Sequence, residues 1–202
     1  MASETQIANM TLVNIGISKP IGNLRTENSN EAKVIRGIFD NERDYVLRHI
    51  RWPFAKQYET LGLVDGAADD PYNDDWVFAY RYPSTCMAVR RIVTDNGKSE
   101  VNQPAWEIAR DSQGRLVLTD EEDAVVEITA RITNAEEFDD MFASALSWKI
   151  ASRVAPALSK IEKMAEACYS MYMQEISAAT AVAMNEGHKP EPAESEFIRA
   201  RD

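Results

Sequence analysis

The chain has 202 residues, with 33 acidic and 22 basic side chains, which gives a formal net charge of -11 at pH 7. Such an acidic chain is poorly suited to gripping nucleic acid, because that requires clustered Lys and Arg to neutralise phosphates. Hydrophobic residues make up 45% of the chain, enough for a packed core, so wholesale disorder is excluded. Only two histidines and two cysteines are present, which removes most metal sites and histidine-based triads.

No stretch approaches the ~20 apolar residues of a membrane-spanning helix, so no membrane association is expected. The N-terminus carries no basic leader and does not resemble a signal peptide. Cys86 and Cys168 lie far apart in the sequence and outside any Cys-x-x-Cys spacing. We interpret both as reduced, buried residues of a protein made in a cytoplasm.

The first quarter of the chain predicts two helices. Ser3 opens a capping box at the start of the first helix, and Gly16 is expected to end it. Apolar residues recur at helical spacing in the second, which should run over residues 30–51. Its predicted capping box consists of Asn28 and Glu31.

From residue 54 the hydrophobic pattern becomes that of β-strands. Aromatic and β-branched residues alternate with polar ones, and turn residues separate the segments. Strands are predicted over 54–64, 76–82, 87–94, 106–110, 116–119 and 124–132, the fourth and fifth forming a hairpin. The last of them alternates like a strand with one face in solvent.

The last third returns to helical patterns. Asn134 and Glu137 are predicted to cap a helix that Pro156 kinks or ends. A second helix carries a heptad-like apolar stripe over residues 161–183. Such a stripe serves either the core of the subunit or a neighbouring copy.

Helices, then strands, then helices predict an α+β protein. The terminal helices should form a helical bundle, into which an antiparallel β-rich module is inserted. We predict a helical core of residues 1–53 and 133–187, a β-rich insertion at 54–132 and an extended C-terminal tail at 188–202.

Acidic residues cluster at 69–75, 120–123 and 136–140. A glycosidase needs two carboxyls, one of them in apolar surroundings that raise its pKa, and no pair shows that asymmetry. The acidic loop at 69–75 lacks the spacing of an EF-hand, and no P-loop, dinucleotide-binding or nucleophile-elbow motif occurs. We therefore predict no catalytic, metal-binding or cofactor-binding residue, and no enzyme.

Basic residues form only small groups that are far apart in the sequence. They are too dispersed to predict a nucleic-acid-binding stripe. Contact with an acidic patch of a partner protein is the better interpretation. The groups are Arg48 with Arg51, Arg90 with Arg91, and Lys149 with Arg153. His49 lies near the apolar face of the second helix and is interpreted as a packed or interface residue.

Four segments resemble known proteins in their order and spacing. Ile7–Gly16 resembles the N-terminal helix of phage head-to-tail connector proteins of the tail tubular protein A type, and Arg43–Ala55 resembles the next helix, with its Trp-x-Phe-Ala signature. Tyr80–Cys86 is similar to the family's Tyr-x-x-Pro-x-x-Cys segment, and Ala135–Leu158 resembles the helix after the sheet. The resemblance covers about residues 5–160.

This resemblance implies a structural adaptor in the virion of a short-tailed bacteriophage (a podovirus). Such adaptors are made in the bacterial host cytoplasm and form rings, usually of twelve copies, between the portal protein and the tail nozzle protein. They extend the DNA channel and hold no cofactor. A net-negative channel wall would let DNA slide, since it offers few contacts to phosphates.

The tail ends with an apolar pair in an otherwise polar extension, Phe197 and Ile198, followed by Arg199. Such pairs are typical of segments that become ordered on binding, so we predict that these residues dock on the portal protein. Two other functions stay open from the sequence. One is a tail-associated polysaccharide hydrolase, and the other is a different neck or tail-completion protein.

Overall fold

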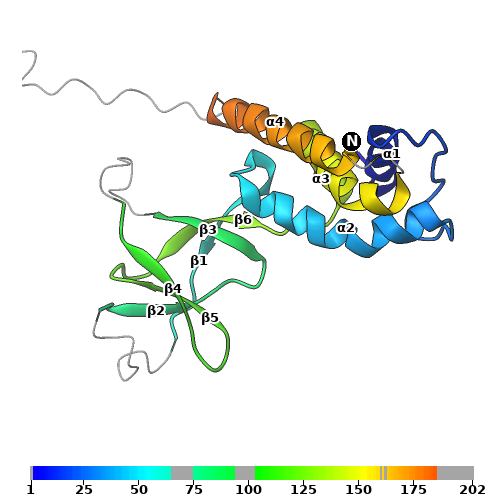
Figure 1. The fold of residues 1–202 in the computed structure, drawn as a ribbon. Coiled ribbons are helices and arrows are strands. Elements are labelled where there is room, and N and C mark those ends of the chain that lie inside the picture. Colours follow the sequence, from blue (N-terminus) through cyan, green and yellow to red (C-terminus); the bar gives the residue numbers. More distant parts are fainter. Residues whose placement is uncertain (1, 65–74, 94–102, 160, 162, 186–202) are drawn as a thin grey trace, which may run out of the picture.

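The computed structural model describes residues 2–64, 75–93, 103–159, 161 and 163–185 (Figure 1). These ranges contain four α-helices and two three-stranded antiparallel sheets. The helices pack together in one part of the molecule and the sheets form the other (Figure 1). The predicted α+β class, a helical bundle with an inserted antiparallel β-rich module, is confirmed. No helix within the described ranges is long and apolar enough to cross a bilayer.

Helix α1 spans Glu4–Asn14 and begins and ends as its local sequence predicts. The Ser3 hydroxyl accepts a hydrogen bond from the Gln6 amide at 3.1 Å, and the Gln6 side chain accepts one from Ser3 at 2.8 Å. Gly16 follows the helix with φ +80°, the left-handed conformation that glycine adopts without strain.

Helix α2 spans Asn30–His49, and its cap differs from the prediction. Ser29, not Asn28, is the N-cap: its hydroxyl accepts a hydrogen bond from the Ala32 amide at 3.3 Å. Three polar residues precede this helix, and the one with extended backbone next to the first turn takes the role. The predicted capping box of Asn28 and Glu31 is therefore wrong.

Helix α3 spans Asp140–Leu158 and begins later than predicted. Asn134 caps a short 3₁₀ turn, Ala135–Glu137, while Asp139 caps α3 itself by accepting from two backbone amides of its first turn. Asn134 and Asp139 thus cap two successive elements, in place of the predicted single capping box of Asn134 and Glu137. Pro156 lies in the last turn, and the helix ends two residues after it.

Helix α4 spans Met164–Asn185 and packs along α3 (Figure 1). Part of the predicted stripe faces the core: the buried members are Cys168, Tyr172, Ile176 and Ala179. Ile161, where the stripe was predicted to begin, is exposed and precedes the helix. The predicted tail, including Phe197, Ile198 and Arg199, lies outside the described residues.

In each sheet the central strand is the one that comes last in the sequence among its three strands. One sheet has the order β1-β6-β3 and the other β2-β5-β4. The strands are β1 Lys56–Thr60, β2 Phe78–Arg81, β3 Cys86–Val93, β4 Trp106–Arg110, β5 Arg115–Thr119 and β6 Val125–Ala130. The predicted hairpin at 106–119 is confirmed, since Trp106 pairs with Thr119. Pro53–Ala55 forms a 3₁₀ turn, which shortens the strand predicted over 54–64.

Strand β6 is buried almost throughout, although its sequence predicted one exposed face. It lies between two neighbouring strands, and even the alternating polar position Glu127 is covered. This carboxylate is paired with Arg91 at 2.7 Å and with Lys56 at 3.7 Å. A buried carboxylate is tolerated here because cations from both neighbouring strands neutralise it.

Candidate functional site

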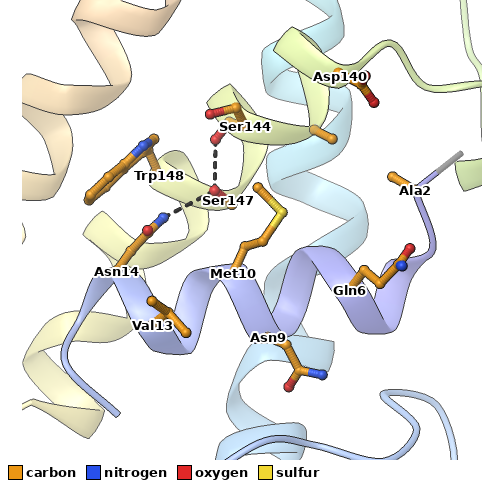
Figure 2. A pocket seen from close by; sticks show the side chains of 11 residues that line it. Ala2, Gln6, Asn9, Met10, Val13, Asn14, Asp140, Ser144, Ser147 and Trp148 are labelled. Carbon is orange, nitrogen blue, oxygen red and sulfur yellow. Dashed lines mark hydrogen bonds between the residues drawn. The ribbon is translucent and has the colours of Figure 1, made fainter. Parts of the chain in front are cut away.

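A groove lies between α1 and α3 on the surface of the helical part (Figure 2). Its volume is about 720 Å³, within the range of ligand and peptide sites. We call it the α1/α3 groove, and its lining includes Gln6, Met10, Val13, Asp140, Ser144 and Trp148. Its walls carry solvent-exposed apolar side chains, of which Val13 is 69% exposed.

Small side chains on α3 leave room for this groove, and hydrogen bonds hold α1 in place beside it. Thr11 donates to the carbonyl oxygen of Ser147 at 3.2 Å, and the Asn14 amide donates to the Ser147 hydroxyl at 3.1 Å. That hydroxyl donates in turn to the carbonyl oxygen of Ser144 at 2.7 Å (Figure 2). Because these hydrogen bonds hold α1 and α3 in place and the side chains between them are small, the concave surface of the groove is preformed.

A second exposed surface combines residues of α2, α3 and α4. We call it the tyrosine face, and it consists of Tyr45, His49, Arg153, Tyr169 and Met173. Tyr45 is 45% exposed and Tyr169 44% exposed, although both are large amphipathic rings. Tyrosine, methionine and arginine are enriched in protein interfaces, so the composition of this face is that of a contact surface.

Lys149 lies beneath the tyrosine face and is only 3% exposed. Its ammonium group lies 4.2 Å from the ring centroid of Tyr45, 5.3 Å from that of Tyr169 and 5.5 Å from that of Tyr172. Burial lowers the pKa of Lys149, while the carboxylate of Glu42, 3.7 Å away, acts in the opposite direction. Three aromatic rings and one carboxylate thus hold a buried cation.

His49 contacts the same cluster from the end of α2. Its Nδ1 atom shares a hydrogen bond with the Tyr172 hydroxyl, and its ring meets Tyr45 edge-on at 5.9 Å. Burial, and then the charge of Lys149, lower the pKa of His49. His49 is thus packed against its neighbours at the edge of an exposed surface, in agreement with its interpretation as a packed or interface residue.

Two of the three basic groups, although far apart in the sequence, lie together in the structure. The Arg51 guanidinium donates to the carbonyl oxygen of Arg90 at 3.3 Å, and that of Arg90 donates to the carbonyl oxygen of Arg48 at 3.1 Å. Arg91 is occupied by Glu127. These arginines bind groups of their own chain at the junction of helix and sheet.

The acidic clusters within the described ranges do not converge. No group of three or more His, Cys, Asp or Glu in these ranges could hold a metal ion. The buried carboxylate of Glu127 and the half-buried one of Glu42 were not predicted, because nothing in their local sequence distinguishes them from surface acids. Both are ion-paired in the folded chain. Residues 65–74, with most of the acidic loop, lie outside the described part.

The two cysteines were interpreted as buried thiols, and this is confirmed. Cys86 lies in the sheet part and Cys168 in the helical part, both buried and free. Burial raises the pKa of each thiol.

The helical part thus carries a groove and an exposed aromatic surface, and the chain adds a β-module to it. No protein-family model matches the chain, and no curated protein matches it. The functional inference therefore starts from the residues of these surfaces and from the resemblance of the four segments.

Proposed function

We propose that this protein is a structural head-to-tail adaptor of a short-tailed bacteriophage, forming a ring between portal and tail nozzle that extends the DNA channel. The observation that carries the proposal is the pair of uncovered contact surfaces on the helical part, the α1/α3 groove and the tyrosine face. A subunit of a closed ring needs one surface for each of its two neighbours. The order of the four resembling segments supports the same function.

The β-module suits contact with the next ring of the assembly. Its two sheets have their own hydrophobic clusters, distinct from that of the helices. A module with its own core can project from a ring of helices without weakening the packing between subunits. The portal protein and the nozzle protein are the partners that the function requires on the two sides of the ring.

The charge of the chain supports a passive channel. At a net charge of -11, a ring of these subunits repels phosphate more than it attracts it. DNA would then pass without specific binding. Ejection of the genome requires such a surface, because tight contacts would have to be broken at each step.

Oligomeric state and portal binding test this proposal together. The purified full chain should form a ring of twelve subunits, the usual number in the adaptors it resembles, visible by light scattering and electron microscopy. That ring should bind purified portal protein. A chain that stays monomeric at micromolar concentration and does not bind portal contradicts the proposal. A monomer that cleaves capsular polysaccharide would support the hydrolase instead, and a ring that binds another neck protein would support a tail-completion protein.

The tail has a separate test. We propose that Phe197, Ile198 and Arg199, outside the described residues, dock on the portal. Deleting residues 188–202 should then weaken portal binding while leaving the ring intact. Unchanged portal binding by the truncated chain contradicts this role.

A further inference from the structure

We propose that copies of this chain bind head to tail, with the tyrosine face of one copy seated in the α1/α3 groove of the next. This inference rests on the proposed function, which requires a closed ring, and it names the two surfaces that meet in that ring. Both surfaces belong to the helical part, so their residues can be substituted without altering the β-module.

The two surfaces lie on opposite sides of helix α3. Ser144 lines the groove and Arg153 belongs to the tyrosine face. Nine positions separate them, and at about 100° per residue their side chains point in opposite directions. A twofold contact pairs a surface with itself, whereas two different surfaces on opposite sides produce a head-to-tail contact that repeats from copy to copy. Repetition with a suitable rotation closes a ring.

The groove offers an apolar hollow for the large exposed side chains of the tyrosine face. The groove is concave and has apolar walls, to which Met10, Val13 and Trp148 contribute. The opposite face presents Tyr45, Tyr169 and their neighbour Met173, which lies one helical turn after Tyr169. Large side chains with few rotatable bonds, inserted into an apolar groove, are the usual anchors of protein interfaces.

The charges of the two surfaces are complementary as well. Asp140 is the one charged residue in the lining of the groove, and no ion pair of Asp140 lies within the described part of the chain. On the opposite side, Lys149 and Arg153 share the single carboxylate of Glu42. These three groups carry a net positive charge, which fits the negative groove. This complementarity favours a second copy of the chain as the occupant.

Charge exchange between the two surfaces tests the contact. Asp140→Arg and Arg153→Asp, each in the full chain, should weaken self-association by at least about tenfold, because like charges then meet. An equimolar mixture of the two variants should associate again, since each groove can find an opposite charge on the other variant. The double variant should also associate by itself. Sedimentation velocity or light scattering measures all four samples.

Matched controls separate this contact from a general effect of charge. Glu136 is an exposed acid close to Asp140 in the sequence and does not line the groove, and Lys33 is an exposed base on α2. Glu136→Arg and Lys33→Asp should leave self-association unchanged. Circular dichroism should show wild-type helix content in every variant, and recovery in the mixture independently shows that the single variants are folded.

The outcomes distinguish this contact from the proposed function. A wild-type ring that binds portal and is insensitive to both charge variants leaves the adaptor standing and overturns the contact. Single variants that fail, with no recovery in the mixture, show that Asp140 and Arg153 do not meet. If deleting residues 188–202 abolishes self-association while charge exchange has no effect, the tail occupies the groove instead. If Asp140→Arg blocks only portal binding, the portal protein occupies the groove instead of a second copy.

Discussion

The guanidinium of Arg90 donates a hydrogen bond of 2.7 Å to the carbonyl oxygen of Ile50, which joins strand β3 to the end of helix α2. It donates also to the carbonyl oxygen of Arg48 at 3.1 Å and to the Thr129 hydroxyl at 2.7 Å. The last carbonyl groups of a helix have no partner within it, and a cation is favourable at this end of the helix dipole. Arg90 therefore caps α2 and fixes the β-module against the helical part.

Replacing Arg90 by alanine should lower the free energy of unfolding by about 1–3 kcal/mol, because the carbonyl groups lose a charged donor. Arg90→Lys keeps the charge, but a single ammonium group cannot reach all three acceptors, so an intermediate loss is expected. The midpoint of urea unfolding measures both. Lys33→Ala, at an exposed site on α2, is the control and should change stability by less than about 0.5 kcal/mol. Wild-type stability of Arg90→Ala contradicts the capping role.

Replacing Lys149 by methionine should destabilise the helical part by about 2–4 kcal/mol, because it leaves the half-paired carboxylate of Glu42 beneath the tyrosines. The Oε2 atom of Glu42 already has no hydrogen-bond partner in the described structure. Adding Glu42→Gln to this variant removes the carboxylate that only Arg153 then neutralises and should recover part of the loss. Urea unfolding of the two single variants and the double variant gives the coupling energy. Strictly additive effects would show that the pair does not interact.

The same substitution should move the pKa of His49. Burial is the main cause that holds this pKa below its ordinary value of 6.5, and the charge of Lys149 adds to it. In Lys149→Met the pKa of His49 should rise, which an NMR titration of the imidazole protons measures. Because the pKa is lower in the folded chain, the unfolded chain takes up the proton first, and stability falls as the pH drops below about 6.5. This acid-dependent loss should be smaller in the variant.

Asp111 should contribute to stability in a defined pH range. Arg81 donates two hydrogen bonds of 2.9 Å to its carboxylate, and backbone amides of Gln113 and Gly114 donate two more. The Arg81 side chain first, and then these amides, lower the pKa of Asp111 from 3.8 to about 2. Because the pKa of Asp111 is lower in the folded chain, its carboxylate stabilises the fold at pH values above the pKa of the unfolded chain. This stabilisation is lost as the pH falls toward 2.

The measurement compares wild type with Asp111→Asn over this range. Asparagine keeps one acceptor oxygen for the backbone amides of the β4–β5 connection and removes the charge together with one of the two acceptors of Arg81. The stability advantage of the wild type, measured by urea unfolding, should be present at pH 5 and disappear between about pH 4 and pH 2. A difference that stays constant over this interval contradicts the role of the ion pair.

Two glycines should respond in opposite ways to alanine. Gly16 has φ +80°, and no atom lies within 4 Å of an added Cβ, so Gly16→Ala should lose about 1 kcal/mol through backbone strain alone. Gly37 lies inside α2 and is equally unobstructed, so Gly37→Ala should gain about 0.5–1 kcal/mol. Thermal unfolding of both variants gives the sign directly. A gain at Gly16 would show that α1 does not end in this conformation.

Local signals predicted the elements whose boundaries depend on local contacts. The cap at Ser3, the end at Gly16 and the hairpin at 106–119 each involve residues that are close in the sequence. The cap of α2 and the start of α3 were mispredicted because several residues that can cap a helix stand side by side there, and packing selects among them. The burial of β6 depends on its central place in the sheet, which its own pattern does not contain.

The sequence by itself determined the composition and charge of this protein, its order of helices and strands, and the burial of its two cysteines. Periodicity and turn residues act within about one element, so they suffice for these features. Only the tertiary structure decided the contacts that matter most here. Arg90 and Ile50 are 40 positions apart, and Lys149 and Tyr45 more than 100. Such pairs meet because whole helices and sheets pack against one another, and a local pattern carries no information on which faces come together.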